Sequence, residues 1–174
     1  MPELGLIFVG FSTAKLRQCL ERIEVCLSEL DGTAIWTRPN AASNSVGNLC
    51  LHLAGNVRQW ILSGIAGQPD HRQRDAEFAA TGGHSRDELL ARLRETVNEA
   101  CAVIEALDEA RLAETVKPQA YEVTVLEAVY HVVEHFTMHT GQLILLTKAA
   151  TGRDLGFYRH LSPGGQGATP GEKP

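Results

Sequence analysis

The chain has 174 residues, of which 44% are hydrophobic and 21% are charged, and its formal net charge at pH 7 is −5. This length predicts a single domain with a core that needs no disulfide bonds, and the hydrophobic fraction is typical of a globular protein rather than a disordered one. The negative charge argues against nucleic acid or anionic lipid as a partner, and no apolar run approaches the roughly 20 residues of a membrane span.

The cysteines indicate a reducing environment. None of them forms a C-x-x-C pair, and each lies in an apolar stretch, as buried thiols of a cytoplasmic protein do. They are Cys19, Cys26, Cys50 and Cys101. The apolar stretch GLIFVGF near the N-terminus is short and has no basic residue before it, so we do not interpret it as a signal peptide. We therefore expect a cytoplasmic protein.

Apolar residues at helical spacing predict four helices. They run from about Ser12 to Leu30, from about Ser45 to Ile65, from Ser85 through Ile104, and from Thr124 to about Ala150. The third and fourth each open on a capping box, in which the first residue and the glutamate three positions later bind each other's free amides. Gly152 is a plausible C-terminal stop for the fourth helix.

Four amphipathic helices without a convincing strand predict an all-α four-helix bundle. The connection between the second and third helices, residues 67–84, is long and polar. Such a connection can cross the bundle and make these two helices parallel, and long loops are often functional. We expect one domain over residues 1–161 and a disordered tail over residues 162–174, which are rich in Gly and Pro.

The predicted fourth helix is apolar around most of its circumference. Between Val125 and Thr147 its only acidic or basic residues besides histidine are Glu127 and Glu134. Such a helix is buried on more than one side. It is therefore either central in the bundle or covered by a second copy of the chain, so we expect a homodimer.

The same helix carries a ridge of histidines in the stretch HVVEHFTMHTGQL. His131, His135 and His139 recur every four residues, so neighbours in the ridge can reach one metal ion, while the outer two lie about 12 Å apart along the axis. One adjacent pair and a third ligand from elsewhere would make a site. His52, on the core side of the second helix, is the best candidate, although a hydrogen-bonded core histidine remains the alternative.

Spacing alone does not choose between the two adjacent pairs. It also permits other metal sites, because His131 to His135 fits the inverted zincin pattern H-x-x-E-H with Glu134 as the base. The chain has no second domain to form a peptide cleft, and Glu134 points about 100° away from His135 around the helix. A ferritin-like di-iron site needs Glu-x-x-His pairs, which neither glutamate of this helix provides.

Two stretches, TRPNAASNSVGNLCLHLAGNVRQWI and HVVEHFTMHTGQLILL, resemble the DinB-like superfamily of bacterial four-helix-bundle proteins. The resemblance covers roughly residues 10–158. It implies an up-down-down-up bundle that binds one divalent metal ion through three histidines, which match His52, His135 and His139. His131 then lies one turn outside the ligand set, where it would line the pocket or support the ligands. Many members of the superfamily form dimers.

The resemblance also implies a chemistry. Some relatives transfer low-molecular-weight thiols such as mycothiol or bacillithiol, so a metal-dependent thiol transferase is the expected function, acting on a small-molecule thiol and an electrophile. Zn or Ni is the expected metal, with Fe or Mn possible at imidazoles. Asn56, one turn after His52, could orient a ligand or a bound water. The alternatives are a metal-binding or stress-response dimer without turnover and, with less support, a metal-dependent hydrolase.

Overall fold

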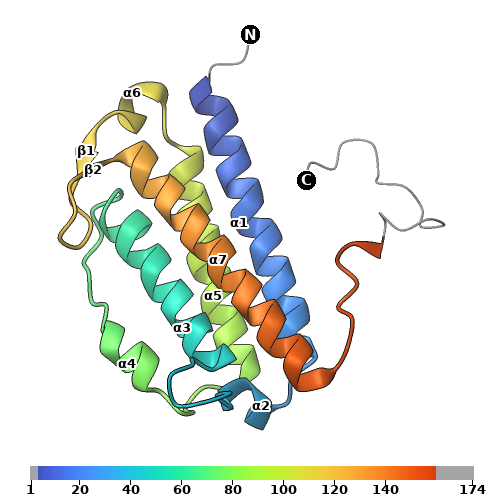
Figure 1. The fold of residues 1–174 in the computed structure, drawn as a ribbon. Helices are drawn as coiled ribbons and strands as arrows, with labels where there is room; N and C mark the ends of the chain where they lie inside the picture. Colours follow the sequence, from blue (N-terminus) through green and yellow to red (C-terminus); the bar gives the residue numbers. More distant parts are fainter. Residues whose placement is uncertain (1–3, 160–174) are drawn as a thin grey trace.

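The computed structural model describes residues 4–159, and within them four long helical segments form a bundle (Figure 1). These are α1 (Leu4–Ser28), α3 (Val46–Val57) with its π-helical continuation η1 (Arg58–Ser63), α5 (Arg86–Glu105) and α7 (Val125–Thr151). The connections contain three short helices and two short antiparallel strands. These are α2 (Gly32–Trp36), α4 (Arg74–Ala79), α6 (Glu109–Leu112), β1 (Thr115–Val116) and β2 (Val123–Thr124).

The bundle has the predicted up-down-down-up topology. α1 packs against α5 and α7, and α3 packs against the same two helices, so α1 and α3 lie on a diagonal. The start of α1, the end of η1, the end of α5 and the start of α7 meet at one end of the bundle (Figure 1). α3 and α5 are therefore parallel, and the chain between them must return along the whole length of the bundle.

Local capping explains where several helices begin and end. The predicted capping boxes at Ser85 and Thr124 are both present, and Ser45 forms a third one with Asn48 at the start of α3. α7 ends at Gly152, as predicted, with φ of 68°, a left-handed conformation that glycine adopts without a steric penalty.

Two expectations about the elements were wrong. α1 begins at Leu4 rather than near Ser12. The sequence does not reveal its first turns, because Leu4, Leu6 and Phe11 are exposed and these turns have no one-sided apolar pattern. The chain also contains the β1–β2 pair, whose two-residue strands are too short to show the alternation by which a strand is recognised. The second predicted helix continues into π-helical geometry in η1. The predicted disordered tail lies outside the described residues.

α7 is apolar on both its inner and its outer face. Its inner residues, among them Phe136, are fully buried in the core. Its outer face exposes four large hydrophobic side chains, Leu126, Tyr130, Met138 and Leu145. In the described part of the chain, no helix is both long enough and apolar enough to span a membrane.

The crossover, residues 67–84, runs over the outer side of α3 and includes α4 (Figure 1). The side-chain amide of Asn48 donates to the backbone carbonyls of Glu77 and Ala80, at 2.9 and 2.7 Å. Trp36 donates from its indole Nε1 to the carbonyl of His84 at 3.1 Å. The bonds from Asn48 hold α4 and its C-terminal end against α3, one turn before His52, and the bond from Trp36 ties the end of the crossover to α2.

Candidate metal centre

Three histidines from two helices converge in the structure. His52 comes from α3, while His135 and His139 are one turn apart on α7, and their candidate ligand atoms all lie within 4.8 Å of one another. The Nε2 atoms of His52 and His135 are 3.1 Å apart. Two nitrogens bound to one tetrahedral ion at about 2.05 Å are separated by about 3.3 Å. The spacing of this pair therefore suits a shared metal ion.

Hydrogen bonds determine which nitrogens face the centre. His52 Nδ1 lies 3.2 Å from Glu77 Oε2, and His139 Nδ1 lies 2.7 Å from Gln142 Oε1. Gln142 Oε1 acts only as an acceptor, so His139 Nδ1 is the protonated nitrogen and its Nε2 keeps the lone pair. His52 Nδ1 also lies 3.1 Å from the donor Arg72 Nη2, and its Nε2 faces His135. Metal-bound histidines in proteins are oriented in this way, by an oxygen bound to the nitrogen that does not bind the metal. The three residues thus fit a divalent ion.

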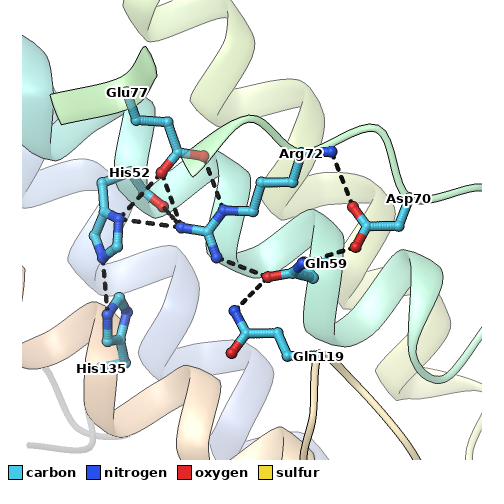
Figure 2. Close-up of polar contacts among 7 residues, drawn as sticks. All are labelled: His52, Gln59, Asp70, Arg72, Glu77, Gln119 and His135. Carbon is cyan, nitrogen blue, oxygen red and sulfur yellow. Dashed lines mark hydrogen bonds and ion pairs between the residues drawn. The ribbon is translucent and has the colours of Figure 1, made fainter. Parts of the chain in front are cut away.

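Glu77 is itself held by a buried arginine from the crossover (Figure 2). Arg72 Nε donates to Oε1 and Nη2 donates to Oε2 of Glu77, both at 2.8 Å, and the Arg72 side chain is only 4% exposed. Burial alone would raise the pKa of Glu77, but hydrogen bonds from Arg72 and His52 outweigh it and hold the pKa below its usual value. The carboxylate is therefore charged at neutral pH and available to His52.

The position of this ion pair depends on a glycine. A Cβ atom at Gly55 would lie 2.0 Å from Glu77 Oε1 and 2.9 Å from Arg72 Nε. Only a residue without a side chain lets the carboxylate approach α3 this closely. Further polar contacts extend from Arg72 Nη1 through Gln59 to Asp70, with bonds of 2.9 and 2.7 Å (Figure 2).

Burial keeps the histidines of α7 neutral. Desolvation, followed by the neighbouring His139 and His52, lowers the pKa of His135 to about 3. Desolvation also lowers the pKa of His139, against an opposing contribution from its bond to Gln142. Since metal ions bind the neutral imidazole, His135 and His139 are ready for a metal at neutral pH without first losing protons.

A cavity of about 570 Å³ opens beside the three histidines. Besides them it is lined by side chains from α3, η1, α7, the crossover and the β1–β2 connection. They include the polar or charged Asn56, Arg72, Arg74, Gln119 and Glu127 and the rings of Trp60, Phe78, Tyr121 and His131. The volume lies within the range of small-molecule sites, so the centre is accessible to a ligand of moderate size.

The other candidate residues occupy distinct places. His131 does not belong to the three-histidine group. Its ring stacks on Trp60, with 3.9 Å between the ring centroids, and its side chain lines the cavity. Asn56 also lines the cavity. Glu134, the base of the zincin pattern, is exposed. His71 and His84 are exposed, while His160 lies outside the described residues.

Sequence reasoning missed Arg72, Glu77 and Trp60. Arg72 and Glu77 lie in the crossover, outside both sequence motifs. Trp60 has the position of an ordinary core residue in the apolar stripe of the second predicted helix. The only available signal was the length and polarity of the connection itself. Neither feature singles out a carboxylate for His52.

Replacing Glu77 tests its role at His52. Glu77→Gln keeps the size but removes the charge that accepts the Nδ1 proton, so we expect Zn²⁺ affinity to fall by about 10–100-fold. Gly55→Ala, which displaces the same carboxylate, should weaken binding in the same direction. Glu134→Gln is the matched control and should bind as the wild type does. Competition with a chromophoric chelator gives the affinities, and circular dichroism verifies the fold. Wild-type affinity in both Glu77→Gln and Gly55→Ala would contradict this role.

The depressed pKa of His135 predicts a pH-dependent stability of the metal-free protein. Between its ordinary value of 6.5 and about 3, the unfolded chain binds a proton at this residue that the folded chain does not. Stability should therefore fall as pH decreases through this window, by up to about 1.4 kcal/mol per pH unit from this group. Urea unfolding of the metal-free protein at several pH values gives the free energy of unfolding as a function of pH. This free energy should depend less steeply on pH in His135→Gln than in the wild type, and as steeply as in the wild type in His84→Gln. Equal slopes for both variants would exclude His135 as the source.

Comparisons with known proteins agree with this fold. Residues 4–162 match the family described as "Protein of unknown function (DUF1572)". A solved structure of a conserved protein from Enterococcus faecalis is similar at 19% identity and a TM-score of 0.68, over 83% of this chain and 97% of that one. The solved structure of the DinB-like protein YjoA from Bacillus subtilis is similar at 16% identity and a TM-score of 0.65, over 84% of this chain and 96% of that one. No curated protein sequence matches. The chain therefore belongs to the DUF1572 family, and it has the DinB-like helical-bundle fold that the two sequence stretches predicted.

Proposed function

We propose that this protein binds one divalent metal ion, Zn or Ni before Fe or Mn, through His52, His135 and His139, and transfers a low-molecular-weight thiol to an electrophile. One observation carries the proposal: three imidazoles converge on one point at the wall of a cavity of small-molecule size. Three protein ligands beside an accessible cavity are typical of catalytic metal sites, whereas structural sites are closed by four.

The chemistry needs a thiolate at neutral pH. A divalent ion held by uncharged ligands supplies positive charge that lowers the pKa of a thiol or water beside it. In the transfer the S–H bond breaks, a bond between sulfur and the electrophilic carbon forms, the proton passes to solvent and the leaving group departs with its electron pair. The role of the protein is to orient His52 and His139 through Glu77 and Gln142, and to surround the reacting atoms with the cavity walls.

A metal-binding protein without turnover would use the same three ligands. The cavity favours the enzyme, because a ligand set that only stabilises the bundle requires no space beside it. The hydrolase alternative has no support from Glu134, which is exposed and lies outside the lining of the cavity.

Two further parts of the proposal concern the oligomeric state of the protein and its location in the cell. We infer a homodimer from the outer face of α7, where Leu126, Tyr130, Met138 and Leu145 are exposed and a second copy would cover them. We also propose a cytoplasmic location. The four cysteines are all unpaired and buried, which suits a reducing compartment.

Metal content and thiol consumption test the proposal together. Untagged wild-type protein should contain about one divalent ion per chain by mass spectrometry, His139→Ala should lose it, and His84→Ala, an exposed histidine of the crossover, should keep it. The metal-loaded wild type should accelerate conjugation of small thiols to a chromogenic aryl halide, and His139→Ala should not. Metal without any thiol transfer would leave the non-catalytic alternative, and no metal after addition of Zn²⁺ or Ni²⁺ would contradict both.

The homodimer is tested by mass in solution. Light scattering should give twice the chain mass of 18.9 kDa for the wild type. Leu145→Glu places a charge in the proposed interface and should shift the protein to the monomer, because a buried unpaired charge is strongly unfavourable. Val25→Glu, at an exposed hydrophobic residue of α1, serves as the comparison. A monomeric wild type would contradict the dimer.

A further inference from the structure

The guanidinium of Arg72 lies within reach of two groups at once. Its Nη2 atom is 2.8 Å from Glu77 Oε2 and 3.1 Å from His52 Nδ1, and the same two atoms of Glu77 and His52 are 3.2 Å apart. The guanidinium only donates and the carboxylate only accepts, so a neutral His52 has two opposite choices. With the proton on Nδ1, it donates to Glu77 and leaves Nε2 free for a metal ion. With Nδ1 accepting from Arg72, the proton is on Nε2 and blocks the ligand atom.

The surroundings of His135 favour the first choice. Its Nε2 lies 3.1 Å from His52 Nε2, and its Nδ1 is buried without a hydrogen-bond partner among the described residues. Burial keeps this imidazole neutral, so it carries one proton. With that proton on Nε2, His135 donates to His52 Nε2 and leaves only an acceptor unpaired. With it on Nδ1, a buried N–H would be unpaired, which is rarer in proteins. The first arrangement requires His52 to be protonated at Nδ1.

Gln59 holds Arg72 on the side away from His52 (Figure 2). Its Oε1 accepts from Arg72 Nη1 at 2.9 Å, and its Nε2 donates to Asp70 Oδ2 at 2.7 Å. One neighbour only donates and the other only accepts, so the orientation of the Gln59 amide is fixed by its partners. A glutamate at this position would have no donor for Asp70, and a methionine would bind neither neighbour.

A second connection of the chain also fixes Gln59. Gln119, between β1 and β2, donates from its Nε2 to the same Oε1 atom, although the two residues are 60 positions apart (Figure 2). Gln119 has a φ of 54°, and it is the only residue other than glycine with a positive φ among residues 4–159. A non-glycine residue keeps this strained conformation only where its surroundings hold it there. Gln59 is thus held by the crossover and by the β1–β2 connection together.

We propose that Gln59 is a positioning residue for the metal centre. It binds Arg72 Nη1 while Glu77 binds Nε and Nη2, so the guanidinium stays with the carboxylate and His52 presents an unprotonated Nε2 to the metal. Gln59 belongs neither to the three-histidine group nor to the cavity lining, so it acts through Arg72. The inference rests on the proposed function in taking His52 as a metal ligand. It adds that the metal-free protein already holds the tautomer that binds.

NMR of the imidazole nitrogens reads the tautomer of the metal-free, full-length protein, with His52→Gln to assign the signals. Wild-type His52 should carry its proton on Nδ1. Gln59→Met removes both hydrogen bonds at nearly constant size, so part of the His52 population should shift to the Nε2–H tautomer. Zn²⁺ affinity, from competition with a chromophoric chelator, should fall by about threefold to tenfold. Gln68→Met is the control, because Gln68 is an exposed glutamine of the crossover that accepts from Arg58 at 3.4 Å. It should match the wild type in both measurements.

Gln59→Glu separates positioning from stability. Its carboxylate keeps an acceptor for Arg72 but repels Asp70, so the melting temperature should fall while the His52 tautomer and the Zn²⁺ affinity stay as in the wild type. Loss of affinity in both Gln59 variants in proportion to their loss of stability would show a merely structural role and overturn the inference. An Nε2–H tautomer in the wild type, or an unchanged tautomer or an unchanged Zn²⁺ affinity in Gln59→Met, would overturn it as well.

Metal content of the same samples separates this inference from the proposed function. A wild type that binds metal, with a tautomer that does not respond to Gln59→Met, would overturn the inference and leave the proposed function standing. A tautomer that depends on Gln59, in a wild type that binds no metal, would support control of His52 by Gln59 and contradict the proposed function.

Discussion

The carboxylate of Glu77 joins the crossover to the bundle and to the candidate metal centre at once. It accepts two hydrogen bonds from the buried Arg72 and one from His52, so three elements of the structure depend on a single charged group. A buried charge is tolerated only when its partners are close and well oriented. The glycine at position 55 supplies the space that this arrangement requires. Loss of Arg72 or of Glu77 would leave the other charge without its ion-pair partner in a buried part of the protein.

The topology explains why this ion pair exists. Parallel α3 and α5 oblige the chain to return along the bundle, and the returning segment passes over the outer side of α3. The inner side of the same helix faces α7 and its histidines. His52 is therefore held between a carboxylate on one side and two imidazoles on the other, which sets the direction of its ring. A direct connection between antiparallel helices would have left His52 without this support.

Desolvation disfavours the charged form of both kinds of group at the centre, yet the outcomes differ. It favours neutral imidazoles at His135 and His139, as metal binding requires, while the arginine keeps Glu77 charged in spite of burial. The protonation states of the metal ligands on α7 and of the supporting carboxylate thus depend on the same buried environment. The fold shared with DinB-like proteins does not by itself assign a reaction to it.

The sequence by itself determined the features that depend on neighbours within one helix. The capping boxes at Ser85 and Thr124, the stop at Gly152 and the ridge of histidines on α7 all follow from spacings of three or four residues. Spacing left open which pair of histidines belongs together, and the resemblance to DinB-like proteins favoured His135 and His139. Only the tertiary structure decided that His131 stacks on Trp60 and that Arg72 and Glu77 support His52. The physical reason is distance along the chain: these partners are 20 or more residues apart, and no helical or strand period relates residues that only the packing of separate elements brings together.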